Sequence, residues 1–148
     1  MMKELKIKKI RDNAKIPTRA TGGSAGFDLY ACIDKPILLN KGETAFIPTG
    51  IAIGIDEPDY AAFIYARSGL AIKQGINLLN SVGVIDSDYR GEIRVGIIKL
   101  TDGAYEIQPF ERIAQMVIQP IALPELKICD ELDETQRGMG GFGSTGKN

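Results

Sequence analysis

Glycine and proline interrupt this chain so often that long regular elements have little room to form. The 148 residues include 17 glycines and seven prolines, and both residue types disfavour the interior of a helix or strand. Between them lie short runs rich in isoleucine, valine and tyrosine, which are typical of strands. The expected strands are Leu5–Ile10, Gly26–Ala31, Glu43–Pro48, Gly50–Ile55, Ala61–Ala66, Glu92–Leu100, Tyr105–Gln108 and Arg112–Ile118. Val84 and Ile85 also resemble a strand.

Helical periodicity is almost absent, and the one expected helix is short, over Leu70–Gln74, ended by Gly75. Many short strands separated by turn residues indicate an all-β fold, a jelly-roll or distorted β-barrel, and not a βαβ arrangement. We expect this domain to occupy residues 1–129. Residues 130–148 are expected to form a C-terminal arm, because their final glycine-rich part cannot join a packed strand without a large entropy cost.

The composition excludes several kinds of chemistry. The chain has no histidine, which removes Ser-His-Asp and Cys-His catalysis and the usual zinc ligand sets. Cys32 and Cys129 lie too far apart in the sequence for a metal-binding motif, and we interpret both as packed thiols. A general base in such a chain must be a carboxylate, a lysine or a tyrosine.

The charge is nearly balanced, with 18 basic and 19 acidic residues and a net charge of -1. No global field therefore attracts nucleic acid or an anionic membrane, and local groups must hold any anionic ligand. Apolar runs such as residues 51–55 are too short to span a bilayer, and the N-terminus lacks the apolar run of a signal peptide. We expect a cytoplasmic protein that binds neither nucleic acid nor membrane.

Glycines in the last twelve residues surround Arg137, Phe142, Ser144 and Thr145. A P-loop is rejected, because Asn148 occupies the position that requires serine or threonine. Glycines still allow backbone N–H groups to approach and donate to phosphate oxygens. An arginine can bind a terminal phosphate, and a phenylalanine ring can stack on a base. A flap that closes over a nucleotide and a frayed terminus are equally compatible with the composition.

Three further polar stretches allow two interpretations each. Residues 67–69 lie where a strand meets the short helix, so they form either an anion site or a serine cap of that helix. Residues 86–91 contain two aspartates, a tyrosine and an arginine, and are either a hairpin tip or a site for a water and a sugar. Asp28 and Gln115 are each the one polar residue in an otherwise apolar strand segment. They either form a shared polar site or lie on exposed strand faces.

In their order along the chain, these stretches resemble the five motifs of the trimeric deoxyuridine triphosphatase (dUTPase) family. The resemblance extends from about Ala25 through the glycine-rich end. The matching segments are Ala25-Gly26-Phe27-Asp28-Leu29-Tyr30-Ala31, Arg67-Ser68-Gly69-Leu70-Ala71, Gly83-Val84-Ile85-Asp86-Ser87-Asp88-Tyr89-Arg90-Gly91, Glu111-Arg112-Ile113-Ala114-Gln115, and Arg137-Gly138 with Gly140-Gly141-Phe142-Gly143-Ser144-Thr145-Gly146.

The resemblance implies a jelly-roll-like homotrimer with active sites between subunits, which hydrolyses dUTP to dUMP and pyrophosphate with Mg²⁺. Such an enzyme limits uracil incorporation into DNA and supplies dUMP for thymidylate synthesis. Asp86 matches the aspartate that activates water for attack on the α-phosphorus, and Asp28 and Gln115 match residues that hold the water ligands of the metal. The implied substrate contacts are Arg67, Ser68 and Gly69 for phosphate, Asn80, Val84 and Ile85 for uracil, Tyr89 for deoxyribose, Arg94, and the tail residues Arg137, Phe142, Gly143, Ser144 and Thr145.

Two positions depart from the family pattern: Ala66 stands where many relatives have proline, and Phe110 where many have glycine. Neither position supplies chemistry, so the departures concern loop geometry. Two alternatives remain, a dCTP deaminase of the same fold and a dUTP-binding sensor that does not hydrolyse its ligand. The complete tail motif and Asp86 favour hydrolysis over both.

Overall fold

The structure, a computed structural model, describes residues 2 and 4–141, and within them it is built of short strands with a short helix, as expected. The strands are β1 (Lys6–Lys9), β2 (Phe27–Tyr30), β3 (Ile37–Leu39), β4 (Thr44–Pro48), β5 (Ile51–Gly54), β6 (Tyr60–Ala66), β7 (Ile76–Leu78), β8 (Gly83–Ile85), β9 (Arg94–Lys99), β10 (Tyr105–Ile107) and β11 (Arg112–Pro120). The helix α1 (Ser68–Gln74) lies between β6 and β7.

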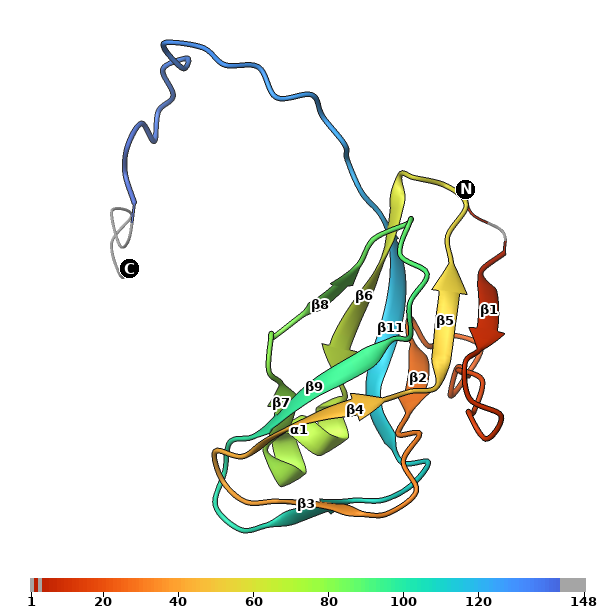
Figure 1. Cartoon of the computed structure of the whole chain (residues 1–148). Helices are drawn as coiled ribbons and strands as arrows, with labels where there is room; N and C mark the ends of the chain where they lie inside the picture. Colours follow the sequence, from red (N-terminus) through yellow and green to blue (C-terminus); the bar gives the residue numbers. More distant parts are fainter. Residues whose placement is uncertain (1, 3, 142–148) are drawn as a thin grey trace.

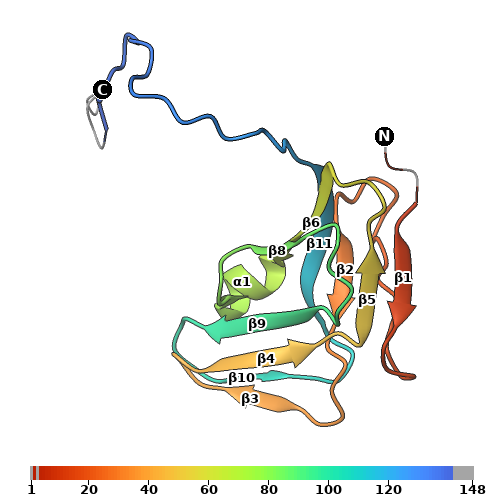
Figure 2. The same ribbon diagram turned by 45° about the horizontal axis from the view of Figure 1, so that its top comes forward.

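The strands form small antiparallel sheets that enclose one core. The orders are β2-β11-β6-β8, β4-β9-β7, β1-β5 and β10-β3. Figures 1 and 2 show the strands β6, β11 and β2 running roughly across the direction of β4 and β9. Apolar side chains from both groups fill the space between them, among them the fully buried Leu29, Ile47, Ile97 and Met116. Each such burial contributes about 1.5–3 kcal/mol, so the core fixes the relative position of the sheets.

Strand β11 is the centre of the largest sheet, because it pairs with β2 on one side and β6 on the other. Ile113, Ala114 and Met116 are buried and Gln115 is partly exposed, and a register shift between Arg112 and Ala114 interrupts a strict alternation. The register places Gln115 opposite Asp28 of β2 and opposite Tyr65 of β6. Residues far apart in the sequence are thereby brought to one sheet surface.

Two strands were not expected from the sequence, β3 and β7, each of three residues. Both are too short for a clear alternation, and both directly follow a residue that breaks regular structure, Pro36 or Gly75. Gly75 ends α1 in the left-handed conformation with φ 63°, and a Cβ there would lie 2.2 Å from the hydroxyl oxygen of Thr101. Glycine is therefore required both for the turn and for the packing.

Strand β11 ends at Pro120, the backbone N–H of Ile121 still donates to the Asp59 carbonyl at 2.8 Å, and residues 121–141 contain no strand. Figures 1 and 2 show this segment, drawn in blue, extending away from the sheets. Leu126 and Ile128 on it are 96% and 97% exposed. An isolated extended segment gains nothing from such apolar exposure, so the arm is suited to contact another surface.

The two cysteines differ from one another. Cys32 is a packed thiol as expected; it donates a hydrogen bond to Asn13 Oδ1 at 3.2 Å, and burial raises its pKa. The expectation for Cys129 was wrong, because that residue lies on the exposed arm. No helix among the described residues is long and apolar enough to cross a membrane.

The turn before β11 is held by Glu111. Its carboxylate accepts hydrogen bonds from the hydroxyl of Tyr105 and from the backbone N–H of Gln108, the latter at 2.9 Å. The turn contains Phe110 with φ 61°, a conformation that favours glycine, and the ammonium of Lys15 lies 5.1 Å from the Phe110 ring centroid. These contacts hold a strained turn in place directly before the strand that carries Gln115.

The Tyr105–Glu111 contact predicts a loss of stability at high pH. Burial, and next the hydrogen bond to Glu111, raise the pKa of Tyr105 from 10.0 to about 12. The contribution of this raised pKa to the free energy of unfolding is fully present below pH 10.0, the ordinary pKa of tyrosine. It is lost as the pH rises to about 12, the pKa in the folded protein. After allowance for solvent screening we expect it to amount to about 1 kcal/mol.

Urea unfolding at neutral pH and at several values between pH 10 and 12 measures this loss. Tyr105→Phe should be less stable at neutral pH and should lose less stability over the alkaline range than the unmodified protein. Tyr65→Phe, which changes a tyrosine elsewhere on the sheet, serves as the control and should keep the alkaline loss. An identical alkaline loss in the Tyr105 variant would show that this contact contributes nothing.

Candidate active site

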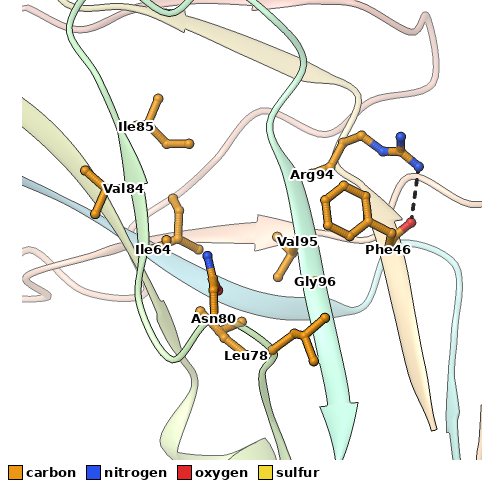
Figure 3. Close-up of a pocket in the computed structure, with 11 residues that line it drawn as sticks. Phe46, Ile64, Leu78, Asn80, Val84, Ile85, Arg94, Val95 and Gly96 are labelled. Carbon is orange, nitrogen blue, oxygen red and sulfur yellow. Dashed lines mark hydrogen bonds between the residues drawn. The ribbon is translucent and has the colours of Figure 1, made fainter.

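A largely apolar hollow, here called the Asn80 hollow, lies between β8, β9 and the end of β7 (Figure 3). Asn80 and Arg94 are its polar side chains. The neighbouring Ser81 has φ 62°, so the turn that presents Asn80 is strained. The lining residues are Phe46, Ile64, Leu78, Leu79, Asn80, Gly83, Val84, Ile85, Arg94, Val95 and Gly96.

A second hollow, the Asp86 hollow, adjoins the first and shares four residues with it: Phe46, Val84, Ile85 and Arg94. Its other lining residues are Asp86, Tyr89, Glu92 and Ile93. Asp86 follows β8 directly, and its exposed carboxylate forms none of the ion pairs found within residues 2 and 4–141. A carboxylate without a cation partner can accept a proton from a water molecule beside it.

Tyr89 is fixed within this second hollow by its neighbours. Its hydroxyl donates a hydrogen bond to the Glu92 carbonyl at 3.1 Å. A Cβ on Gly91 would lie 2.3 Å from the same hydroxyl, so only glycine leaves room for the ring. The Glu92 carboxylate is held in turn by Arg11 at 2.9 Å and by the backbone N–H of Gly50 at 3.0 Å.

A third hollow, the Arg67 hollow, lies where β2, β11 and the start of α1 meet. It is polar and is lined by Ala20, Ser24, Gly26, Asp28, Arg67, Ser68, Gly69 and Gln115. Asp28 is 8% exposed and is bound by two arginines: Arg67 Nε donates to its Oδ1 at 2.9 Å, and Arg112 Nη1 to its Oδ2 at 3.1 Å. Two cations against one anion leave a positive charge, which suits an anionic ligand.

Ser68 and Gln115 line this hollow from α1 and β11. The alternative in which Ser68 caps α1 is wrong, because the cap residue is Arg67 and no side chain makes a cap hydrogen bond. Gln115 donates from Nε2 to the Ala66 carbonyl at 3.0 Å. This bond holds the amide in place and leaves its oxygen available as an acceptor.

The structure thus groups the expected site residues into two separate sets. Asn80, Val84, Ile85, Asp86, Tyr89 and Arg94 line the first two hollows, and Asp28, Arg67, Ser68, Gly69 and Gln115 line the third. No residue lines both the Arg67 hollow and either of the others. Arg137 lies on the exposed arm, with its Nε donating to the Gly140 carbonyl at 2.9 Å. Phe142, Gly143, Ser144 and Thr145 lie outside the described residues.

Two residues at these hollows were missed by the sequence analysis. Arg112 was quoted only as part of a motif, yet it binds Asp28, the partner of Arg67. Phe46 lies in a strand with no polar signal, yet it lines both the Asn80 and the Asp86 hollows. The apolar run Ala45-Phe46-Ile47 gives no sequence signal that Phe46 is the exposed member, so only the structure shows it.

Proteins of one known family resemble this chain over most of its length. A sequence model of the dUTPase family matches residues 12–146. The chain belongs to the dUTPase family. The deoxyuridine 5'-triphosphate nucleotidohydrolase of Paraburkholderia xenovorans (strain LB400) is 48% identical over 148 residues, with both chains fully covered. The protein of the same name from Burkholderia cenocepacia (strain HI2424) is 49% identical over the same length.

Solved dUTPase structures share the fold. The dUTPase of Staphylococcus bacteriophage 80alpha with dUpNHpp superposes with a TM-score of 0.86 at 31% identity, covering 98% of this chain and 99% of the phage chain. A dUTPase mutant from phage phi11 of S. aureus, solved to describe how a structural Mg(II) ion is coordinated, gives a TM-score of 0.77 at 27% identity. It covers 87% of this chain and 98% of its own. These similarities show that the chain shares the dUTPase fold over most of its length.

Proposed function

We propose that this dUTPase-family chain hydrolyses dUTP to dUMP and pyrophosphate, as a dUTP diphosphatase. Membership of the family and full-length relatives named deoxyuridine 5'-triphosphate nucleotidohydrolase support the reaction. The observation that carries the proposal is the position of Asp86, an exposed carboxylate in the hollow that directly adjoins the apolar Asn80 hollow. A base can enter the hollow while its phosphates remain beside the carboxylate.

The nucleoside would be recognised by the β8 region. Strand β8 is the last strand of its sheet and pairs on one side only, with β6. The backbone groups of Val84 and Ile85 that do not pair are therefore available to the edge of a uracil, together with the amide of Asn80. The ring of Tyr89, fixed by Gly91 and Glu92, would lie under the deoxyribose and leave no space for a 2′-hydroxyl.

The phosphates would be held by Arg67, Ser68 and Gly69. Arg67 uses Nε on Asp28 and Nη1 on the Arg112 carbonyl at 3.3 Å, which orients its remaining N–H groups. The residues also fit Mg²⁺ held through water: Asp28 and the Gln115 oxygen can accept hydrogen bonds from water ligands, and residues 2 and 4–141 contain no cluster of three acidic or thiol groups that would coordinate the ion directly. Bound Mg²⁺ would offset the negative charge of the triphosphate.

Hydrolysis needs one proton transfer and one displacement at phosphorus. Asp86 accepts a proton from water, and the water oxygen attacks the α-phosphorus as the bond from that phosphorus to the bridging oxygen of pyrophosphate breaks. Arg67 offsets the charge that develops on the phosphate oxygens, and Arg137 of the arm adds a second guanidinium when the arm closes. Phe142, Gly143, Ser144 and Thr145 would complete that closure.

The separation of the hollows supports a homotrimer in which subunits share active sites. One dUTP must reach both the Asp86 hollow and the Arg67 hollow, but these share no lining residue within a chain. Two copies that face each other can supply one hollow each. The exposed apolar side chains of the arm also suit contact with a neighbouring copy.

Asp86→Asn should abolish turnover and leave binding nearly intact. The amide keeps the size of the side chain but cannot accept the proton, and loss of a general base typically lowers the rate by about 10²–10⁴-fold. Pyrophosphate release from dUTP with Mg²⁺ measures the rate, and titration with dUpNHpp measures binding. Asp88→Asn, a change of the nearby exposed aspartate that lines neither hollow, is the control and should remain active.

Parallel reactions with dCTP and UTP distinguish the alternatives. Ammonia from dCTP would indicate a deaminase, and binding of dUTP without turnover by the unmodified protein would indicate a sensor. Full activity of Asp86→Asn would contradict the assigned role of the carboxylate.

Shared sites predict that two inactive variants restore activity when mixed. Asp86→Asn disables one hollow and Arg67→Gln the other, so some sites in mixed trimers combine two intact hollows. The two proteins should be unfolded together, refolded together and assayed for pyrophosphate release. If each active site lay within a single chain, the mixture would stay as inactive as its components.

A further inference from the structure

Phe46 is a large aromatic residue on the outer side of β4, and its side chain is 60% exposed. Its cross-strand partner in β9 is Gly96. A Cβ on Gly96 would lie 3.3 Å from the edge of the Phe46 ring, so the ring lies against bare backbone. Covering a strand glycine accounts for this one edge of the ring.

Arg94 lies over the ring of Phe46. The guanidinium carbon lies 4.8 Å from the ring centroid, within the range of cation–π contact. Arg94 Nη2 also donates to the Phe46 carbonyl at 3.5 Å, a long hydrogen bond shown as the dashed line in Figure 3. Arg94 takes part in none of the ion pairs of residues 2 and 4–141, so the ring is the chief contact that orients its charge.

The pair lies at the junction of two hollows. Phe46 and Arg94 line both the Asn80 hollow and the Asp86 hollow. In Figure 3 they lie beside each other along β9, and the side chains of Ile64 and Asn80 lie on the other side of that strand. A nucleotide with its base in the first hollow and its α-phosphate beside Asp86 must pass this junction.

We propose that Phe46 is a positioning residue for the nucleotide, which acts by holding the guanidinium of Arg94 toward the phosphate-bearing end of the substrate. The inference rests on the proposed function and adds to it a residue outside the five motifs. A carboxylate could also fix Arg94, but it would neutralise the arginine and repel the triphosphate. An aromatic ring fixes the guanidinium and leaves its positive charge available.

Removal of the aromatic face should weaken nucleotide binding without slowing chemistry. Phe46→Leu keeps an apolar side chain over Gly96 but cannot make the cation–π contact. We expect KM for dUTP, and Kd for dUpNHpp, to rise about two- to five-fold with little change in kcat. Phe46→Tyr keeps the aromatic face and should restore values near those of the unmodified protein. Leu38→Ala, an exposed strand residue that lines neither hollow, should change none of these constants.

The decisive comparison is a double-mutant cycle with Arg94→Met. If Phe46 acts through Arg94, Phe46→Leu should have no further effect on Kd once Arg94 has been replaced. An equal rise of Kd with and without Arg94 would overturn the proposal, because the ring would then act by direct contact or through the fold. A fall in kcat or in melting temperature of the Phe46→Leu protein that accounts for the loss would overturn it as well.

Binding of dUpNHpp keeps this test separate from the test of hydrolysis. In that analogue an NH group replaces the bridging oxygen next to the α-phosphorus, so affinity is measured without turnover. Absence of dUTP hydrolysis by the unmodified protein would contradict the proposed function while the cycle on Kd still decides the role of Phe46. Normal hydrolysis with no coupling between Phe46 and Arg94 would contradict the inference alone.

Discussion

The cluster of Asp28 with Arg67 and Arg112 joins the elements on which the phosphate half of the site depends. Asp28 comes from β2, Arg112 from the start of β11, and Arg67 from the end of β6, so one nearly buried carboxylate links three neighbouring strands. Loss of either arginine would leave a buried charge poorly paired, which is costly. The second arginine also balances Asp28, so the site remains positive where an anion must bind. Stability and ligand binding therefore depend on the same contacts.

The other half of the site depends on sheet edges and on turns that tolerate strain. Strand β8 is an edge strand, and the turns beside it include Ser81 with a positive φ and Gly91 packed against Tyr89. Edge backbone and a fixed ring can recognise a nucleoside without any charged group. Asp86 and Arg94 then mark the route from the base to the phosphates. This half and the phosphate half share no lining residue, which supports the proposal that subunits share active sites.

Sequence reasoning named most of the polar residues that line the three hollows, because these residues stand out against apolar strands. A shared polar site was one of two interpretations of Asp28 and Gln115, and the register of β2 and β11 places these residues opposite each other. Contacts between distant strands could not be predicted from the sequence. The residues around Arg112 do not indicate that Asp28 lies beside it, and Phe46 lies in a segment with no polar signal. The short strands β3 and β7 were missed for a related reason, since three residues are too few to show a period. The expectation that Cys129 is packed was wrong, because the last strand ends at Pro120 and Cys129 lies on the exposed arm beyond it.

The destination of the attacking oxygen tests the central claim most directly. The unmodified protein should be incubated with dUTP and Mg²⁺ in water enriched in a heavy oxygen isotope, and both products analysed by mass spectrometry. Attack of Asp86-activated water on the α-phosphorus places the heavy oxygen in dUMP and none in pyrophosphate. Heavy oxygen in pyrophosphate would mean attack at the β-phosphorus and would contradict the arrangement of Asp86 and the phosphate-binding residues proposed for this site.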